Sequence, residues 1–409
     1  MRVLRGTLVG ILSGCASIFL ASDDAHAFKI VSFNGKFTRF NTKTVSYVVD
    51  RSGSDNFENG CDGSGSCLSE REAVRTSFDS WTNIPGVDIT FVEDEPRSIK
   101  ATGYDNVNTV KWIERAWREL PFSPPSSALA VTISTYTTDD MVIVDSDTHF
   151  NGEDFQWCAI NSPEEENGDC VDIQNIATHE FGHFIGLDHS SENIFEPESK
   201  LYLATMFFAS GPRETFRRLL KEDDQAAALN LYPTEDPNEP LIESISPNVV
   251  NPATTSATAV RIVGQNFLNH SAAMLATRGD RGDVVGRVIS VSENEMNVVF
   301  DLYGLPSGGY DVVVANAFDR TDRVEEGFRL SGNSGNVDGS YTSGDGNGGF
   351  GSSGGGGCDI PAQPDQAGVP GSAILALLLP LILIGLARFY LSPEPRSSEP
   401  RLAAKKEPK

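Results

Sequence analysis

The chain has 409 residues, which is too long for a single hydrophobic core. Two folded domains with connecting segments are therefore expected. Its formal net charge is −25, because 57 Asp and Glu residues outweigh 32 Lys and Arg residues. A nucleic-acid partner is not expected, since neutralising phosphates requires clustered basic side chains.

The first residues have the composition of an export signal. Two arginines come early, residues 6–21 are uncharged and mostly apolar, and small residues precede a cleavage point after Ala27. Residues 1–27 are therefore predicted to be a signal peptide. A second interpretation overlaps it, because Leu12-Ser13-Gly14-Cys15 resembles a bacterial lipobox, which would place a lipid on Cys15. Both interpretations predict an exported protein, located at the cell surface or outside the cell.

Export to an oxidising compartment favours disulfide bonds. Two pairs of cysteines are near neighbours in sequence and lie in stretches rich in Gly, Asp and Ser, namely Cys61 with Cys67 and Cys158 with Cys170. These pairs are predicted disulfides, although sequence alone does not fix connectivity, and buried free thiols are the alternative. Cys358 is left over.

Residues 28–233 alternate strand-like and helical patterns. Strand-like runs occur at residues 44–49, 87–92, 128–134 and 141–144. Ser69 and Glu72 have the spacing of a capping box at the start of a helix, and a second helical pattern at residues 110–120 ends at prolines. The alternation predicts an α/β or α+β domain that ends near Pro233.

Residues 179–189 carry the most specific pattern of the chain, His-Glu-Phe-Gly-His-Phe-Ile-Gly-Leu-Asp-His. On a helix, residues four apart share a face, so His179 and His183 can bind one metal ion with Glu180 beside its water. Gly186 can adopt a positive φ and end the helix, which allows His189 to return as a third ligand. Three neutral imidazoles leave one tetrahedral position of a zinc ion open for water.

With this pattern the chain is identified as a member of the metzincin superfamily of zinc proteases, and Ser190 after the third histidine resembles the matrixin branch. The resemblance implies an α+β catalytic domain, a twisted mixed sheet with an active-site helix. It also implies a methionine turn beneath the zinc, which Met206 supplies. The interval from His189 to Met206 is long for a matrixin, so residues 192–200 are predicted to be a surface insertion.

Two further segments extend the matrixin resemblance across most of residues 44–233. Asp223 and Asp224 resemble the paired acids of the C-terminal helix, which buttress the active site in that family. Residues 147–151 resemble the edge-strand segment near the substrate cleft. The family's latency segment with its cysteine switch is not visible between Ala27 and the first strand.

One catalytic zinc ion is the cofactor that the resemblance implies. Animal matrixins bind a second, structural zinc through three histidines and an aspartate, but outside the motif the mature chain has only His149 and His270, so a second zinc is not expected. Acidic groups at residues 139–147 and 164–169 could supply oxygen ligands for calcium. No ligand spacing there matches a known loop, so a solvated acidic surface is expected.

A polar, Pro-rich linker at residues 234–241 is followed by short β-branched runs, so residues 242–331 predict an all-β sandwich. Its strand and turn positions resemble the immunoglobulin-like TIG (IPT) family, whose domains serve as spacers or binding modules. The tandem Arg-Gly-Asp at residues 278–283 resembles an integrin ligand, but a charged turn between strands is the favoured interpretation.

The end of the chain has the composition of a tether followed by a membrane segment. Residues 332–365 are Gly-rich and predict a flexible tether. Residues 366–387 carry no charge and predict a transmembrane helix, and residues 388–409 form a basic tail, as the positive-inside rule expects for a cytoplasmic end. The arrangement also resembles the sorting signals of bacterial surface proteins. A permanent anchor and removal after sorting both remain open.

The sequence therefore predicts a zinc-dependent endopeptidase at the cell surface, with peptides or proteins as substrates and the cell envelope as its other partner. In this hypothesis Glu180 takes a proton from the attacking water and returns it to the leaving amine. The alternative is a surface adhesion or binding protein in which the metzincin scaffold is vestigial. A zinc hydrolase with a non-peptide substrate is a third, minor alternative.

Overall fold

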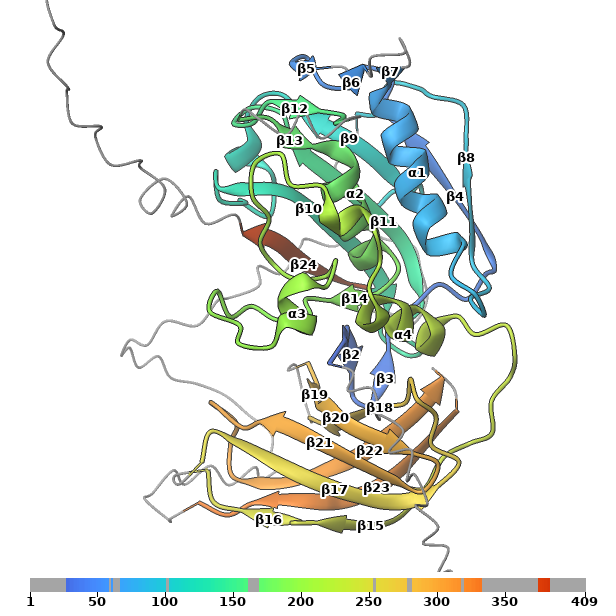
Figure 1. The fold of residues 1–409 in the computed structure, drawn as a ribbon, viewed down its shortest axis with the longest axis vertical. Coiled ribbons are helices and arrows are strands. Elements are labelled where there is room, and N and C mark those ends of the chain that lie inside the picture. The colour runs from blue at the N-terminus through green and yellow to red at the C-terminus, as the bar shows by residue number, and fades with distance from the viewer. Residues whose placement is uncertain are drawn as a thin grey trace, which may run out of the picture.

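The computed structural model describes residues 27–58, 60–61, 67–100, 103–160, 169–252, 255–277, 282–317, 320–332 and 374–382. Figure 1 shows two bodies, an α+β body built mainly from residues 27–233 and a second body of strands that follows it in the chain. Some predictions lie outside the described residues: the signal peptide with its lipobox, most of the tandem Arg-Gly-Asp, nearly all of the tether with Cys358, and the basic tail.

The α+β body is built on a mixed sheet with the strand order β24-β10-β11-β9-β4-β8. Its strands are β4 (Thr44–Val49), β8 (Thr90–Glu93), β9 (Thr109–Ile113), β10 (Ala128–Thr137), β11 (Ile143–Asn151) and β24 (Ile374–Ile382). β4 runs parallel to β8 and β9, and β9 runs parallel to β11, whereas β10 is antiparallel to β11. This is the mixed sheet that the metzincin resemblance implies.

Two predictions about this sheet are wrong. The helical pattern at residues 110–120 forms β9 and a 3-10 turn, η1 (Trp117–Glu119). Val110 and Trp112 are buried in the core, so tertiary packing outweighs a weak local helical spacing. Residues 147–151, which resemble an edge strand, lie in β11 between β10 and β9 and are therefore an inner strand.

Two helices cover one face of the sheet (Figure 1). α1 (Glu70–Thr82) begins with the predicted capping box, in which Glu72 N donates to the Ser69 hydroxyl at 3.2 Å. α2 (Ile173–Phe184) packs on α1 through Phe78 and Phe181, whose ring centroids lie 3.6 Å apart. The later helices of the body are α3 (Ser199–Leu203) and α4 (Glu222–Leu231).

Short strand pairs complete this body. β1 (Lys29–Ile30) pairs with β14 (Leu187–Asp188), so the N-terminal segment lies against the residues that precede His189. β2 (Ser32–Phe33) and β3 (Lys36–Phe37) form a hairpin. The remaining short elements are β5 (Phe57–Glu58), β6 (Gly60–Cys61), β7 (Cys67–Leu68), β12 (Trp157–Cys158), β13 (Val171–Asp172) and the 3-10 turn η3 (Phe216–Arg218).

The second body consists of two β-sheets that enclose an apolar core. One sheet has the order β15 (Leu241–Ser246), β17 (Ala257–Gln265), β21 (Glu295–Asp301), β20 (Arg287–Ser292). The other has the order β16 (Val249–Val250), β23 (Arg320–Leu330), β22 (Gly308–Ala317), β18 (Ala272–Ala276), β19 (Val284–Val285). Ile262, Met296 and Phe328 are fully buried in it. The assignment of this body to the TIG family stays a prediction.

The β2–β3 hairpin lies between the two bodies (Figure 1). Gly35 N donates to Asp283 Oδ2 at 2.6 Å, and Asp283 N donates to Ser32 O at 3.2 Å. Gly35 has a φ of 76°, and a Cβ atom there would lie 3.1 Å from Val313, so glycine permits this approach. Buried side chains of β18 and β22, including Met274, belong to the same apolar cluster as the α+β core. The second body is thus packed directly on the first.

No helix among the described residues is long and apolar enough to cross a membrane. Within the predicted span at residues 366–387, residues 374–382 are described and form β24. β24 runs antiparallel to β10 at the edge of the mixed sheet (Figure 1). The predicted helix is not found over these residues, because their backbone pairs with a strand distant in sequence, a partner that local hydropathy does not reveal.

Candidate metal centre

α2 and the turn that follows it position the predicted metal ligands. Asp172 caps the helix, because its Oδ1 accepts from Asn175 N at 2.8 Å. Gly186 follows the helix with a φ of 108°, and a Cβ atom on it would lie 2.1 Å from Thr38 O. Both the positive φ and the close approach therefore require glycine at this position. The chain then turns into β14, which leads directly to His189.

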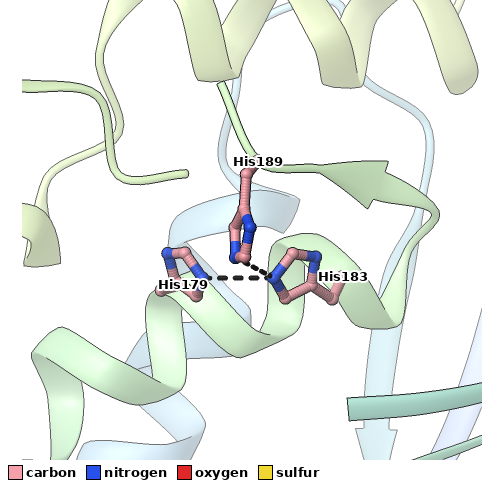
Figure 2. A group of neighbouring side chains, drawn as sticks. All are labelled: His179, His183 and His189. Carbon is pink, nitrogen blue, oxygen red and sulfur yellow. Dashed lines mark hydrogen bonds between the residues drawn. The ribbon is translucent and has the colours of Figure 1, made fainter. Parts of the chain in front are cut away.

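The imidazoles of His179, His183 and His189 converge on one point (Figure 2). The Nε2 atom of His183 lies 3.1 Å from that of His179 and 3.1 Å from that of His189. A tetrahedral zinc ion with Zn–N distances of about 2.0–2.1 Å places neighbouring ligand nitrogens about 3.3–3.4 Å apart, so these two distances are close to those of a zinc site, and all three ligand nitrogens lie within 4.8 Å of one another. Among the described residues, this triad is the one group of three or more His, Cys, Asp or Glu side chains close enough to hold a metal ion.

The other ring nitrogen of each histidine faces a hydrogen-bond acceptor. His179 Nδ1 lies 2.7 Å from Thr205 O, and His183 Nδ1 lies 2.9 Å from Leu187 O. His189 Nδ1 lies 3.3 Å from a carboxylate oxygen of Glu192. Each Nδ1 therefore carries the hydrogen, which leaves the Nε2 lone pair for a metal. Burial lowers the pKa of His179 and His183 well below the ordinary value, so both are neutral at pH 7.

Glu180 lies beside the triad and is fully buried. Its Oε2 accepts a hydrogen bond from the Thr132 hydroxyl at 2.7 Å, whereas its Oε1 has no hydrogen-bond partner among the described residues. Burial raises the pKa of Glu180 to about 8, against the lowering effect of the Thr132 hydroxyl. The carboxyl group can therefore take up and release a proton near neutral pH. Sequence reasoning missed Thr132, because no local motif connects it to α2.

Met206 packs against α2, the helix that carries His179 and His183. A Cβ atom on Gly182 of α2 would lie 2.1 Å from Met206 Sδ, so the thioether packs on a helix position that must lack a side chain. Asp224 fixes this turn, because its two carboxylate oxygens accept from Met206 N at 3.0 Å and Thr205 N at 2.9 Å. Gly182 was not singled out from the sequence, although a glycine in the middle of a buried helix is a signal for such a close contact.

The paired acids of α4 have separate partners. Asp224 also accepts from Lys221 N at 2.8 Å, and Asp223 accepts from Ala27 N at 2.6 Å. Burial and the adjacent Asp224 raise the pKa of Asp223 to about 7. The two carboxyl groups thus hold the methionine turn and the N-terminal segment from one helix.

Arg217 is a buried cation close to the methionine turn that the sequence analysis did not identify. It is 2% exposed, and its guanidinium donates to the carbonyls of Tyr202 at 3.0 Å and Ala204 at 3.2 Å. It also pairs with Glu214 and lies 5.4 Å from the centre of the Phe207 ring. Burial lowers its pKa to about 10. Arg217 therefore joins the segment before Met206 to the segment after it.

Of the two predicted disulfide pairs, one is bonded in the structure and the other is described only at the level of its backbone. Cys158 and Cys170 form a disulfide with an S–S distance of 2.10 Å, and it links β12 to the residue that precedes β13. Cys61 and Cys67 are register partners in the β6–β7 pair, while their side chains lie outside the described set.

The first of the two acidic stretches considered for calcium, residues 139–147, has exposed residues at its start and buried residues at its end. Asp139 and Asp140 are exposed, whereas Asp145 and Asp147 lie on β11 and are 2% exposed each. The expectation of a solvated acidic surface is therefore wrong for the latter two, because the strand carries them into the interior. Residues 164–168 of the second stretch lie outside the described residues.

Comparison with known proteins agrees with this geometry. Residues 64–233 match the family model of the matrixin peptidases. Metalloendoproteinase 1 of Glycine max is 24% identical over 164 residues, which are 40% of this chain and 45% of that protein. The chain thus covers less than half the length of this relative. The match and the histidine triad together support a matrixin-like metzincin domain.

Proposed function

We propose that the chain is a zinc-dependent endopeptidase that hydrolyses peptide bonds of extracellular proteins. The observation that carries the proposal is the arrangement of the triad: three buried Nε2 atoms converge while every Nδ1 faces an acceptor. The matrixin match over residues 64–233 supports the same class of enzyme. One catalytic zinc ion is proposed, and no group of acidic side chains among the described residues supports a calcium site.

A zinc ion bound by His179, His183 and His189 would supply Lewis acidity for the scissile carbonyl and for a water molecule. Glu180 acts as the general base, and its unpartnered Oε1 is the oxygen available to take a proton from the attacking water. The same carboxyl group then donates the proton to the amine of the leaving peptide. Burial of the triad and of Glu180 restricts bulk water from the reacting groups.

The test uses the purified full chain, with zinc content measured alongside cleavage of casein and of a peptide library. Wild-type protein is expected to hold one zinc ion and to lose activity with a chelator. Glu180→Gln should keep the zinc and lose activity by about 10²- to 10⁴-fold. Undiminished hydrolysis by Glu180→Gln would sink the proposed mechanism. Stoichiometric zinc without cleavage of any peptide would favour the adhesion protein with a vestigial metzincin scaffold.

Export to the cell surface or beyond is part of the proposal, and it rests on the composition of residues 1–27 and 366–409. Mass determination of the native mature protein would fix both termini. A mature N-terminus at Phe28 is the expected result, and lipidated Cys15 is the competing one. The C-terminal mass distinguishes a retained apolar segment from one removed after sorting.

A further inference from the structure

The two carboxylate oxygens of Glu180 have different surroundings. Oε2 accepts from the Thr132 hydroxyl at 2.7 Å, and Oε1 is buried without a hydrogen-bond partner in the described part of the chain. Because Glu180 is 0% exposed, solvent does not replace the Thr132 hydroxyl. The carboxyl group is therefore held at one oxygen and left open at the other.

The direction of the hydrogen bonds follows from the single hydrogen of a threonine hydroxyl. Thr132 Oγ1 lies 2.7 Å from Glu180 Oε2, 3.2 Å from Glu180 O and 3.0 Å from Thr148 Oγ1. The shortest contact leads to Oε2, and the carboxylate that acts as a base is ionised and only accepts, so Thr132 donates to Oε2. Thr148 then donates to Thr132, and a chain of two hydroxyl groups ends on Glu180.

The sheet fixes the position of this chain. Thr132 of β10 and Thr148 of β11 are direct register partners, and both are buried. Their branched side chains have restricted χ1 angles. Two residues further along each strand, the Ser134 and Ser146 hydroxyls form a similar pair at 2.9 Å, so hydroxyl pairs repeat on this face. Glu180 is thus oriented by the sheet that α2 packs on, in addition to its own helix.

We infer that Thr132 is a positioning residue for the general base: it holds Glu180 Oε2 so that Oε1 faces the reacting water. The inference rests on the proposed function. Thr148 has the smaller role of donating to the Thr132 oxygen, which strengthens the bond to the carboxylate.

The experiment compares Thr132→Val, which keeps the shape and removes the donor, with Thr132→Ser, which keeps the donor. Thr132→Val is expected to lower kcat by about 10- to 100-fold, with KM and zinc content unchanged, because the base is misplaced. Thr132→Ser should restore most of kcat, and Thr148→Val should cause a smaller loss. Ser134→Ala is the matched control, since it removes a hydroxyl from the same face without contacting Glu180. Wild-type kcat in Thr132→Val, or equal losses in Thr132→Val and Thr132→Ser, would overturn the inference.

A second measurement keeps the inference separate from the proposed function. Thermal unfolding of the full chain is compared for wild type, Thr132→Val, Glu180→Ala and the double variant. Thr132→Val should lower Tm more in the wild-type background than when Glu180 is already alanine, because the bond to the carboxylate is then absent. Additive Tm shifts contradict the inference even in an active enzyme. A wild-type protein that cleaves no peptide contradicts the proposed function, while the Tm comparison still decides whether Thr132 holds Glu180.

Discussion

The two bodies of the chain differ in the charged groups that they bury. Among its described residues, the α+β body buries eight Asp, Glu, Lys or Arg side chains: Asp50, Asp145, Asp147, Asp172, Glu180, Arg217, Asp223 and Asp224. Among the described residues of the second body, Asp311 is the one charged side chain in the buried set, and it pairs with Arg323. Burying an ionisable group is unfavourable unless its hydrogen bonds are satisfied.

The difference separates the roles of the two bodies. In the α+β body, buried carboxylates bond to backbone N–H groups at the points where the candidate site is held, as Asp172 does at α2 and Asp224 does at the methionine turn. The second body relies on apolar packing around residues such as Phe328 and Met296. Buried Asp and Glu side chains are therefore concentrated in the body that holds the candidate site, and substitutions of single carboxylates test that relation.

The largest effect is expected from Asp224→Ala. This change leaves the buried N–H groups of Thr205 and Met206 and the partly buried N–H group of Lys221 without an acceptor. The free energy of unfolding should fall by about 3–5 kcal/mol, and zinc affinity should fall with it because the methionine turn is released. Urea unfolding and zinc titration measure the two effects. Glu222→Ala, an exposed carboxylate of the same helix turn, is the control, and equal losses in both variants would contradict the comparison.

A pH-dependent effect of intermediate size is expected from Asp147. Burial and the neighbouring Asp145 raise its pKa to about 8, and burial raises the pKa of Asp145 to about 7. Because the pKa of each carboxyl group is higher in the folded than in the unfolded protein, protonation of these groups favours the folded state. This stabilisation is fully present below pH ~4 and is lost as the pH rises through ~8. Wild-type stability should therefore fall across this range by several kcal/mol from these groups.

Asp147→Asn should flatten that dependence, because the amide oxygen can still accept from Thr109 N and Oγ1 without a charge to bury. Urea unfolding of the metal-free protein at pH 5 and pH 8 measures the difference. The variant should gain stability relative to wild type at pH 8. A pH profile parallel to that of wild type would show that the Asp147 carboxylate is not held neutral by burial.

The sequence predicted the parts of the site that depend on local spacing. The helix around His179 and His183 and the turn at Gly186 follow from local spacing and from the conformational preferences of single residues. The capping box of α1 was predicted for the same reason. These features need no partner from a distant part of the chain.

The features that the sequence did not predict are contacts between distant segments. Thr132 contacts Glu180 only because β10 lies beside α2. β1 pairs with β14, although most of the sequence of the α+β body separates the two strands. β9 had a helical pattern, but its place between β4 and β11 decided its structure. Each case depends on tertiary packing, which local pattern does not contain.

The smallest effect is expected where the two bodies meet. Asp283 accepts from Gly35 N at 2.6 Å through Oδ2 and from Thr277 N at 3.0 Å through Oδ1, so Asp283→Ala removes one bond within the second body and one to the β2–β3 hairpin. The free energy of unfolding should fall by about 1–2 kcal/mol, while kcat and zinc content stay at wild-type values, because neither bond reaches the triad. Glu325→Ala, an exposed carboxylate of β23, is the control and should change stability by less than about 0.5 kcal/mol. A loss of activity in Asp283→Ala beyond its loss of stability would mean that the second body also positions the catalytic groups, through the hairpin and the adjoining β1 strand beside β14.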